Sequence, residues 1–440
     1  MNEKKPCDLL IFGDVVLPMT SGLPELADSA VVVVDGAIAE VGAAADLRAR
    51  WEPGDEIRGG VVLPGLVNTH GHAGMTLYRG LGDDMPLEKW LHEFVWPAEK
   101  LLATEENVAA GTQLAIAEML ASGTTCFADM YFFQQRVGDV ASACGIRTLL
   151  GQAVIGFPVP GCPTPEHAFE KVRALHERFA GDPLVDTSMA LHAVYTLTPE
   201  LLARGAEVAG GLGVPLQIHV SETETEVRNC RAEHGLTPPA LLKRTGVLRR
   251  GTICAHGVHL TDEDVALVRD SGAGVSLNPE SNLKLASGIP DIAGLLAAGI
   301  PLGLGTDGAA SNNDLDMWDS VRLAALLPKG VTRDPEVVPA GAAVRLATAG
   351  GAAVLGLADR VGTLVPGMRA DLCVIDTDAA HLTPLYHALS HLAYATHGSD
   401  VIHTVVDGRV VYRDRVHTTL DLESTKNEVR RIAAKIAVGV

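Results

Sequence analysis

Two histidines one residue apart are the first side chains in this sequence whose types and spacing could do chemistry. His70 and His72 flank Gly71 at the end of the apolar run "VVLPGLVNTH". In an extended strand, residues i and i+2 point to the same side, so both imidazoles face one point. Neutral imidazole is a common ligand for zinc and iron. We therefore expect a metal ion at that point; for an isolated pair, two hydrogen-bonded histidines in a surface turn are the alternative.

The elements that must position these residues follow a regular pattern. Short apolar runs alternate with longer helical patterns, which is typical of βαβ units and a parallel sheet. Helix boundaries are marked between them, for example by Thr198 and Pro199 before one helix and by the capping pattern Thr261 to Asp264 before another. The runs are residues 60–70, 124–130, 147–154, 186–194, 215–222, 251–259, 273–279 and 301–307. Eight runs separated by helices predict an α/β fold with a distorted (β/α)8, or TIM, barrel.

The two ends of the chain differ from this middle part. Residues 8–60 and about 366–420 lack long helical patterns and contain two "VDG" hairpin signals. We predict that residues 1–59 and 366–440 form one small β-sandwich domain, and that residues 60–365 form the catalytic barrel inserted between them.

Polar residues collect where the predicted barrel strands end. Beyond His70 and His72, the later runs carry His192, His219 with Glu222, His256 and Asp307. Each histidine alone could be a hydrogen-bonded core residue, and Asp307 alone could be a turn residue. Because barrel active sites lie at the carboxyl ends of the strands, their joint occurrence predicts a metal site there.

Composition limits the classes of protein that fit. Lys and Arg total 35 against 54 Asp and Glu, a formal charge of −19 that disfavours nucleic acid and anionic membranes as partners. The N-terminal apolar run is too short for a signal sequence or a membrane span, so we expect a cytoplasmic protein. The 7 cysteines form no C-x-x-C pair and leave one over, which argues against a disulfide framework.

Several segments resemble the amidohydrolase superfamily, in particular its deaminases of purine nucleosides. The resemblance lies in "PGLVNTHGHAGMTLYRGL", "IHVSE", "AHGVHL", "NPESNLKLASGI" and "LGTDGAASNNDLDM", and it extends over nearly the whole chain. It implies hydrolytic deamination of adenosine-type nucleosides such as 5'-methylthioadenosine, S-adenosylhomocysteine, 5'-deoxyadenosine or adenosine. It also implies a homo-oligomer with no partner beyond the nucleoside substrate.

The resemblance assigns the metal ligands as His70, His72, His219 and Asp307. They would hold one divalent ion, with Zn²⁺ expected and Fe²⁺ as the alternative. Relatives with two metals bridge them through a carboxylated lysine near the fourth run. No lysine occurs between Lys171 and Lys243, so one metal is expected.

The remaining roles follow from the residue types and the resemblance. Zinc lowers the pKa of bound water to about 7 and so supplies hydroxide. Glu222 is expected to protonate the ring nitrogen, Asp307 to accept the proton of the water, and His256 to stabilise the attacking oxygen. The resemblance further places Glu99 at the ribose hydroxyls and His192 near the purine.

The 5' end of the substrate is the point where the sequence departs from relatives that accept S-adenosylhomocysteine. Where such relatives carry arginines for the amino-acid carboxylate, this chain has Gln152 and His167. A neutral amide cannot form the forked ionic pair of a guanidinium, so we predict a preference for short uncharged 5' groups. Arg79, Arg136 or an arginine of another subunit remain as alternative partners for the carboxylate.

Two other functions stay open at this level. A guanine, cytosine or triazine deaminase or hydrolase would share the metal ligands and differ in the pocket. A noncatalytic scaffold on the same barrel would require a missing ligand, and all four are present in the sequence.

Overall fold

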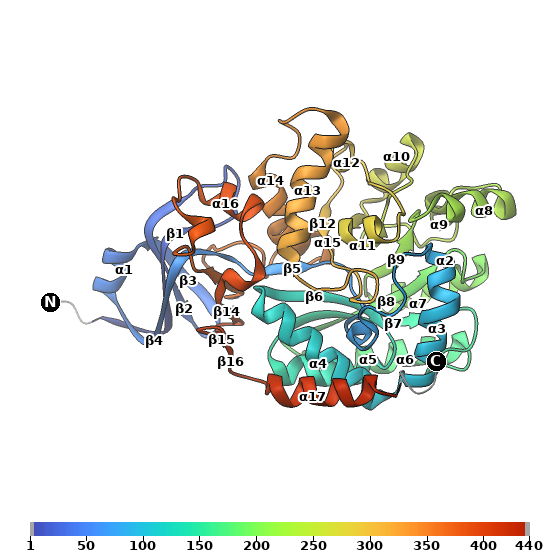
Figure 1. Cartoon of the computed structure of the whole chain (residues 1–440), viewed down its shortest axis with the longest axis horizontal. Coiled ribbons are helices and arrows are strands. Elements are labelled where there is room, and N and C mark those ends of the chain that lie inside the picture. Colours follow the sequence, from blue (N-terminus) through green and yellow to red (C-terminus); the bar gives the residue numbers. More distant parts are fainter. Residues whose placement is uncertain (1–3, 436–440) are drawn as a thin grey trace.

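The computed structural model describes residues 4–435 and contains a closed parallel barrel beside a separate mixed sheet (Figure 1). The barrel strands follow each other in chain order, and the last pairs with the first through Leu304 and Asn68. They are β5 (Leu66–Asn68), β6 (Thr124–Tyr131), β7 (Arg147–Val154), β8 (Val185–Ala193), β9 (Leu216–Val220), β10 (Thr252–His256), β11 (Gly274–Leu277) and β12 (Leu302–Leu304). Each matches one of the eight predicted runs to within a residue at either end or lies inside it, which confirms the predicted barrel.

Helices surround the barrel and connect consecutive strands. After β5 come η1 (Ala73–Tyr78), α2 (Leu87–Trp90), η2 (Leu91–Val95), α3 (Trp96–Leu102) and α4 (Glu105–Ala121). The following connections carry α5 (Gln134–Cys144), α6 (Pro165–Arg178), α7 (Pro199–Leu212), α8 (Glu224–His234), α9 (Pro238–Arg244), α10 (Asp262–Ser271), α11 (Pro279–Lys284) and α12 (Ile292–Ala297). After β12 the chain forms α13 (Met317–Thr332), α14 (Ala340–Arg345), η3 (Leu346–Gly350) and α15 (Gly351–Leu355).

The helix boundaries have the local causes that the sequence indicates. Thr198 caps α7 by accepting a hydrogen bond from Leu201 N, and Gly213 ends the helix in the left-handed conformation. Thr261 and Asp264 form the reciprocal capping box that begins α10.

Both ends of the chain build the second sheet, as predicted. It contains β1 (Lys5–Val16), β2 (Leu26–Val34), β3 (Ala37–Ala43), β4 (Trp51–Pro64), β13 (Leu372–Ile375), β14 (Val401–Val406), β15 (Arg409–Arg413) and β16 (Val416–His417), with α1 (Ala44–Arg50) between β3 and β4. Side chains of both halves share one core, and Ile38 N donates to Met368 O across the open edge, so the sheet folds over as a β-sandwich. Two of its hairpins turn at the predicted Asp-Gly pairs, Asp35–Gly36 and Asp407–Gly408, where positive φ suits the turn.

Two details show how the sheet and the barrel connect. Strand β4 stays in the terminal sheet as far as Pro64, so residues 60–64 pair with β1 and β13 before the chain enters the barrel at β5. Near the other end, α17 (Leu422–Ala433) packs against α4 of the barrel (Figure 1).

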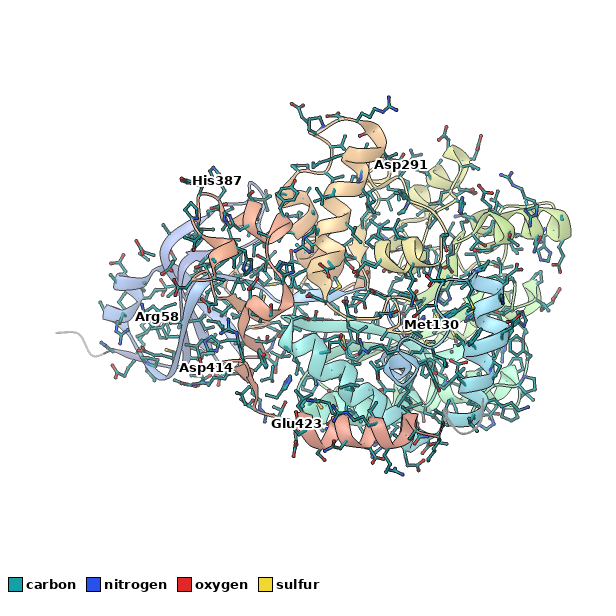
Figure 2. All side chains as sticks on the ribbon, viewed as in Figure 1. Arg58, Met130, Asp291, His387, Asp414 and Glu423 are labelled. Carbon is teal, nitrogen blue, oxygen red and sulfur yellow. The ribbon has the colours of Figure 1, made fainter. Side chains whose placement is uncertain are left out.

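The remaining elements lie away from the barrel mouth. Helix α16 (Ala388–Tyr394) packs on α13 and α14, with η4 (Ala380–Leu382) before it and η5 (Gly398–Asp400) after it. Figure 2 shows His387 near the edge of the molecule, whereas Met130, a buried residue of β6, lies among the elements of the barrel. Among residues 4–435, we find no helix with the length and apolar character needed to cross a membrane.

Candidate metal centre and active site

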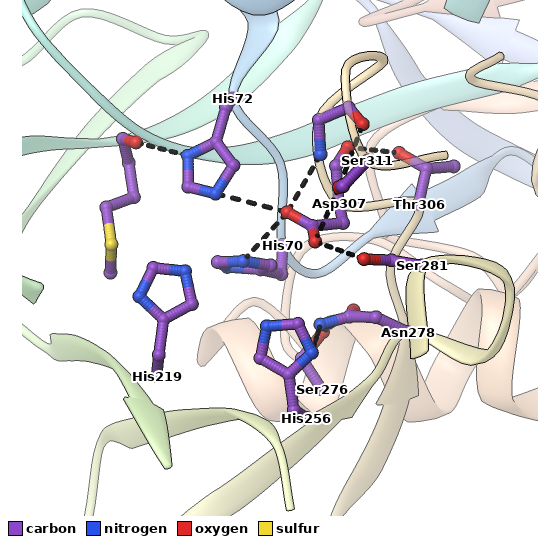
Figure 3. A network of polar contacts seen from close by, with 12 residues as sticks. His70, His72, His219, His256, Ser276, Asn278, Ser281, Thr306, Asp307 and Ser311 are labelled. Carbon is purple, nitrogen blue, oxygen red and sulfur yellow. Dashed lines mark hydrogen bonds and ion pairs between the residues drawn. The ribbon is translucent and has the colours of Figure 1, made fainter. Parts of the chain in front are cut away.

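Three histidines and one aspartate meet at the carboxyl ends of the barrel strands (Figure 3). Ligand atoms of His70, His72 and His219 lie within 4.8 Å of one another. Asp307 Oδ1 lies 3.1 Å from His72 Nε2 and 3.5 Å from His70 Nε2. The fold therefore brings together the four residues predicted as metal ligands.

Hydrogen bonds orient two of these imidazoles for ligation. His72 Nδ1 donates to Met130 O at 2.5 Å, and His219 Nδ1 donates to His192 O at 2.7 Å. Because each Nδ1 carries the proton, each Nε2 keeps its lone pair for a cation, an arrangement typical of metal-binding histidines. His70 Nε2 is fully buried and has no hydrogen-bond partner among the described residues. A metal ion would satisfy that atom.

Electrostatics at this cluster favour a positive charge. Burial lowers the pKa of His70 to about 4 and holds the pKa of His219 well below its usual value, so both rings are neutral. Burial also opposes charge on His72, but the Asp307 carboxylate outweighs it and raises the pKa of His72 to about 9. Burial likewise raises the pKa of Asp307, but the neighbouring His70 and His72 side chains hold it well below the usual value. The carboxylate therefore stays ionised and keeps a proton on His72, and a divalent cation bound at this point would displace that proton from His72 Nε2.

Other polar groups fix Asp307 at the end of β12. Its Oδ2 accepts hydrogen bonds from Ser281 at 2.7 Å and Ser311 at 2.9 Å, and its Oδ1 accepts one from Gly308 N at 2.8 Å. Its backbone has a φ of +64°. A non-glycine residue in the left-handed region is strained and persists only where its surroundings fix it.

A separate carboxyl group, Glu222, lies beside the metal cluster. Its Oε2 is 3.7 Å from His256 Nε2, and its Oε1 accepts a hydrogen bond from Ser287 Oγ at 3.2 Å. Burial raises the pKa of Glu222. The backbone N–H groups of Ser221 and Glu222 both donate to the carboxylate of Glu226. Glu226 thus holds the end of β9 in place.

His256 is oriented by the loop that follows β11. Its Nδ1 lies 2.8 Å from Asn282 Oδ1, which can only accept, so Nδ1 carries the proton in the neutral ring. Its Nε2 therefore presents a lone pair toward Glu222 and the cavity.

One cavity is lined by most of the candidate catalytic groups and extends outward from them. Its lining includes His72, Glu99, His192, Glu222 and Asp307. Glu99 is buried and accepts a hydrogen bond from Tyr131 at 2.8 Å, and burial raises its pKa to about 7. Burial and the neighbouring His72 and His70 lower the pKa of His192 to about 3, so this ring is neutral.

Gln152 does not line this cavity, which corrects its prediction as a substrate-binding residue. Along β7 the side chains alternate, and Ala153 faces the cavity while Gln152 points to the other side. There Gln152 Oε1 accepts from Gln134 N at 3.5 Å, and Nε2 lies 3.6 Å from Cys162 Sγ. Strand β7 is buried along its whole length, so its hydropathy does not reveal which face is inward.

The alternative partners for a substrate carboxylate also lie elsewhere. Arg79 pairs with Glu118, and Arg136 pairs with Asp139 at 3.8 Å beside a different cavity. His167 lies in the first turn of α6 and lines neither cavity.

Sequence reasoning missed the residues that hold the functional groups. Ser281, Asn282 and Ser287 lie in "NPESNLKLASGI", and Ser311 lies in "GTDGAASNND", both segments that carried the family resemblance. That resemblance marks the segments, whereas the hydrogen bonds assign each serine and asparagine its role. Glu226 lies in the first turn of α8, three residues after the N-cap Thr223. This spacing signals the start of a helix, but it does not indicate the hydrogen bonds that Glu226 accepts from Ser221 and Glu222.

Comparison with known proteins agrees with this geometry. The amidohydrolase family profile matches residues 61–411. A 5-methylthioadenosine/S-adenosylhomocysteine deaminase of Syntrophobacter fumaroxidans is 43% identical over 98% of both chains. The crystal structure of an adenosine deaminase from Xanthomonas campestris with bound zinc has a TM-score of 0.97 and 38% identity, and the alignment covers 99% of this chain and 100% of that one. An atrazine chlorohydrolase from Arthrobacter aurescens shares the fold, with a TM-score of 0.89 and 22% identity. That alignment covers 97% of this chain and 100% of the chlorohydrolase. The chain belongs to the amidohydrolase family.

Proposed function

We propose that this protein is a zinc-dependent deaminase that converts adenosine-type nucleosides, among them 5'-methylthioadenosine, into the inosine analogues and ammonia. The observation that carries the proposal is a separate buried carboxyl, Glu222, beside a cluster of metal ligands in one cavity. Hydrolytic loss of ammonia from a purine needs an acid near the ring nitrogen as well as an activated water. The names of the relatives, a deaminase of 5-methylthioadenosine and S-adenosylhomocysteine and an adenosine deaminase, support the same reaction.

The donor set fits one zinc ion. His70, His72, His219 and Asp307 supply three nitrogens and one oxygen, which are ligands that zinc accepts. A bound zinc ion supplies Lewis acidity that lowers the pKa of water to about 7. With no lysine between Lys171 and Lys243, the chain lacks the bridging ligand expected of a two-metal site near β8.

Three residues move or hold protons around the ring. Glu222 has a raised pKa and can keep the proton that it delivers to the ring nitrogen. Asp307, whose Oδ1 faces the histidines, accepts the proton of the attacking water and delivers it to the amino group, which leaves as ammonia. His256 Nε2 accepts a hydrogen bond from that water and, once protonated, donates to the developing negative charge.

Two further groups orient the substrate. The Glu99 carboxylate, held by Tyr131, accepts hydrogen bonds from the ribose hydroxyls. The neutral ring of His192 contacts the base from the end of β8. A free base such as guanine or cytosine, or a triazine, offers no ribose to Glu99. The buried carboxylate therefore favours a nucleoside over these alternative substrates.

The test measures ammonia release by the purified protein from adenosine, 5'-deoxyadenosine, 5'-methylthioadenosine, guanine and cytosine. Metal content is determined on the same sample, before chelation and after zinc is returned. We expect about one zinc per chain and activity on the adenosine derivatives that chelation removes and zinc restores. Activity on guanine or cytosine alone, or activity that survives removal of the metal, would contradict the proposal.

A further inference from the structure

The active-site cavity adjoins a second space, which we call the outer hollow. The two spaces share the lining residues Leu87, Leu91, Trp96 and Tyr195, and the outer hollow continues past Phe157 and Glu226. With the base at the metal cluster and the ribose at Glu99, a 5' substituent that extends past these shared side chains reaches the outer hollow.

The walls of the outer hollow are aromatic and partly open to solvent. Phe157 packs edge-on against Trp96, with ring centroids 5.3 Å apart, and Tyr195 packs against His192. Phe157 and Tyr195 are 37% and 44% exposed, so they offer uncovered apolar surface at the mouth. Aromatic rings at that place suit a thioether or an alkyl group, because sulfur–aromatic contacts are favourable.

Acidic side chains line this path. Asp307 lines the inner cavity and Glu88 lines the outer hollow. Glu99, Glu222 and Glu226 also line the two spaces, and burial raises the pKa of all three. Among the described residues that line either space, none is Lys or Arg, and His92 is the one basic side chain of the outer hollow outside the inner cavity. Lys89, beside Glu88 in sequence, pairs with Glu93 at 3.8 Å and does not line either space.

We propose that the outer hollow is a subsite for uncharged or cationic 5' substituents and that it rejects a terminal carboxylate, with Glu88 as a specificity-determining residue. The inference rests on the proposed nucleoside deaminase function. It agrees with the preference predicted from the sequence but for a different reason. Gln152 does not contribute to this selectivity, because it points away from the cavity. The selectivity depends instead on the charges of the residues that line the path of the 5' substituent.

The expected difference between the two substrates follows from the lack of a Lys or Arg partner for the carboxylate of S-adenosylhomocysteine among the described residues of the path. A hydrogen bond to a charged group strengthens binding by roughly 10- to 100-fold. No Lys or Arg of the described chain lines the path, so the carboxylate of a substrate would not gain such a bond from either residue type. We expect kcat/KM for 5'-methylthioadenosine to exceed that for S-adenosylhomocysteine by about tenfold or more.

The experiment compares three substrates that isolate the carboxylate. They are 5'-methylthioadenosine, S-adenosylhomocysteine, and the aminopropyl thioether of adenosine, which has the length of the second but lacks its carboxylate. Ammonia release by the zinc-loaded protein gives kcat/KM for each. We expect the aminopropyl compound to be used about as well as 5'-methylthioadenosine. Equal values for 5'-methylthioadenosine and S-adenosylhomocysteine overturn the proposal, and an aminopropyl compound as poor as S-adenosylhomocysteine overturns it too, because length would then be the cause.

Two variants test whether Glu88 sets the selectivity. Glu88→Arg replaces a carboxylate of the hollow by a cation, and we expect the ratio of kcat/KM for S-adenosylhomocysteine to that for 5'-methylthioadenosine to rise at least about threefold. Glu93→Arg makes the same charge change at a residue that lines neither space, and the ratio should keep its wild-type value. An equal rise in both variants means a general charge effect and refutes the role of Glu88. If none of the three compounds releases ammonia, the proposed function itself fails, and this inference falls with it.

Discussion

Asp307 combines two tasks on one carboxylate. Its Oδ1 faces the Nε2 atoms of His70 and His72, while Oδ2 is held by Ser281 and Ser311. One oxygen is thus directed at the metal site while the other anchors the side chain. The neighbouring carboxyl, Glu222, contacts His256 and Ser287. It is not one of the predicted metal ligands, so it is available to act as an acid.

Replacing Asp307 by Asn tests the first task. The amide has the same shape but no charge, so we expect zinc content to fall and kcat to drop by at least about 10²- to 10⁴-fold, with the circular dichroism spectrum unchanged. Measurement of kcat and of zinc content on the same preparation of the variant tests both expectations. Wild-type rates in the variant would remove Asp307 from the mechanism.

Glu222→Gln separates acid catalysis from metal binding. The amide cannot deliver a proton to the ring nitrogen, so kcat should fall by about 10²- to 10⁴-fold while zinc content stays at the wild-type value. Loss of zinc in this variant would show instead that Glu222 is a ligand.

The raised pKa of Glu99 leads to a prediction of how substrate binding depends on pH. Burial raises its pKa to about 7, so the carboxylate is ionised above that pH and becomes neutral as the pH falls through it. Charged acceptors make hydrogen bonds about twice as strong as neutral ones, so KM for nucleosides should rise as the pH falls from about 8 to 6. In Glu99→Gln, KM should be high at every pH and this dependence should disappear. A wild-type KM that is constant across this range would contradict the role of Glu99.

At the scale of elements, the site depends on how closely strand ends approach each other. Strands β12 and β5 are adjacent, and the segment after β12 passes directly against the backbone of His70. A Cβ on Gly305 would lie 2.6 Å from Asn278 Oδ1 and 2.9 Å from the backbone N and O of His70. Only glycine permits this approach.

Gly305→Ala should therefore displace His70 and lower zinc content, although residue 305 touches no metal. Inductively coupled plasma analysis of the purified variant measures this. Gly211→Ala in α7 is the matched control, because a Cβ there meets no atom within 4 Å and alanine favours a helix. Full zinc occupancy in Gly305→Ala would show that the strand ends can separate without cost to the site.

At the scale of the whole molecule, a buried ion pair joins the barrel to the terminal sheet. Arg147 on β7 is 1% exposed and donates to both oxygens of Asp371, at 2.7 and 3.1 Å, just before β13. It also lies 3.2 Å from Asp407 in the β14–β15 hairpin. Removing one partner of a buried pair leaves the other charge uncompensated.

Asp371→Asn should accordingly lower the unfolding temperature, with a loss of about 3 kcal/mol in stability. Differential scanning calorimetry measures the shift. Glu428→Gln, which removes one partner of an exposed pair on α17, serves as the control and should leave the transition in place. Equal transitions in both variants would mean that the Arg147–Asp371 pair does not contribute to the stability of the fold.

The sequence by itself determined the architecture and the metal ligands. Alternation of apolar runs with capped helices is a local signal, and eight such units can close into a barrel whose strand ends share one face. The two Asp-Gly turns are also local, because they depend on residues that tolerate positive φ. These signals place several histidines and Asp307 together at the strand ends, and the family resemblance then selects His70, His72, His219 and Asp307 among them as the predicted metal ligands.

The tertiary structure decided which side chains face the cavity and what holds them. Gln152 and Ala153 are neighbours on a strand that is buried on both faces, so hydropathy cannot tell which one points inward, and only closure of the barrel settles it. Ser281 and Ser311 meet Asp307 from 26 and 4 residues away, and Glu226 reaches back to the end of β9. The contact of Ser281 depends on the path of the chain between β11 and β12, which no local propensity encodes. The contacts of Ser311 and Glu226 are close in sequence, but the turns that form them are fixed only when the strand ends pack together. For the same reason, the acidic lining of the outer hollow exists only once α2, α8 and the loop after β8 are packed together.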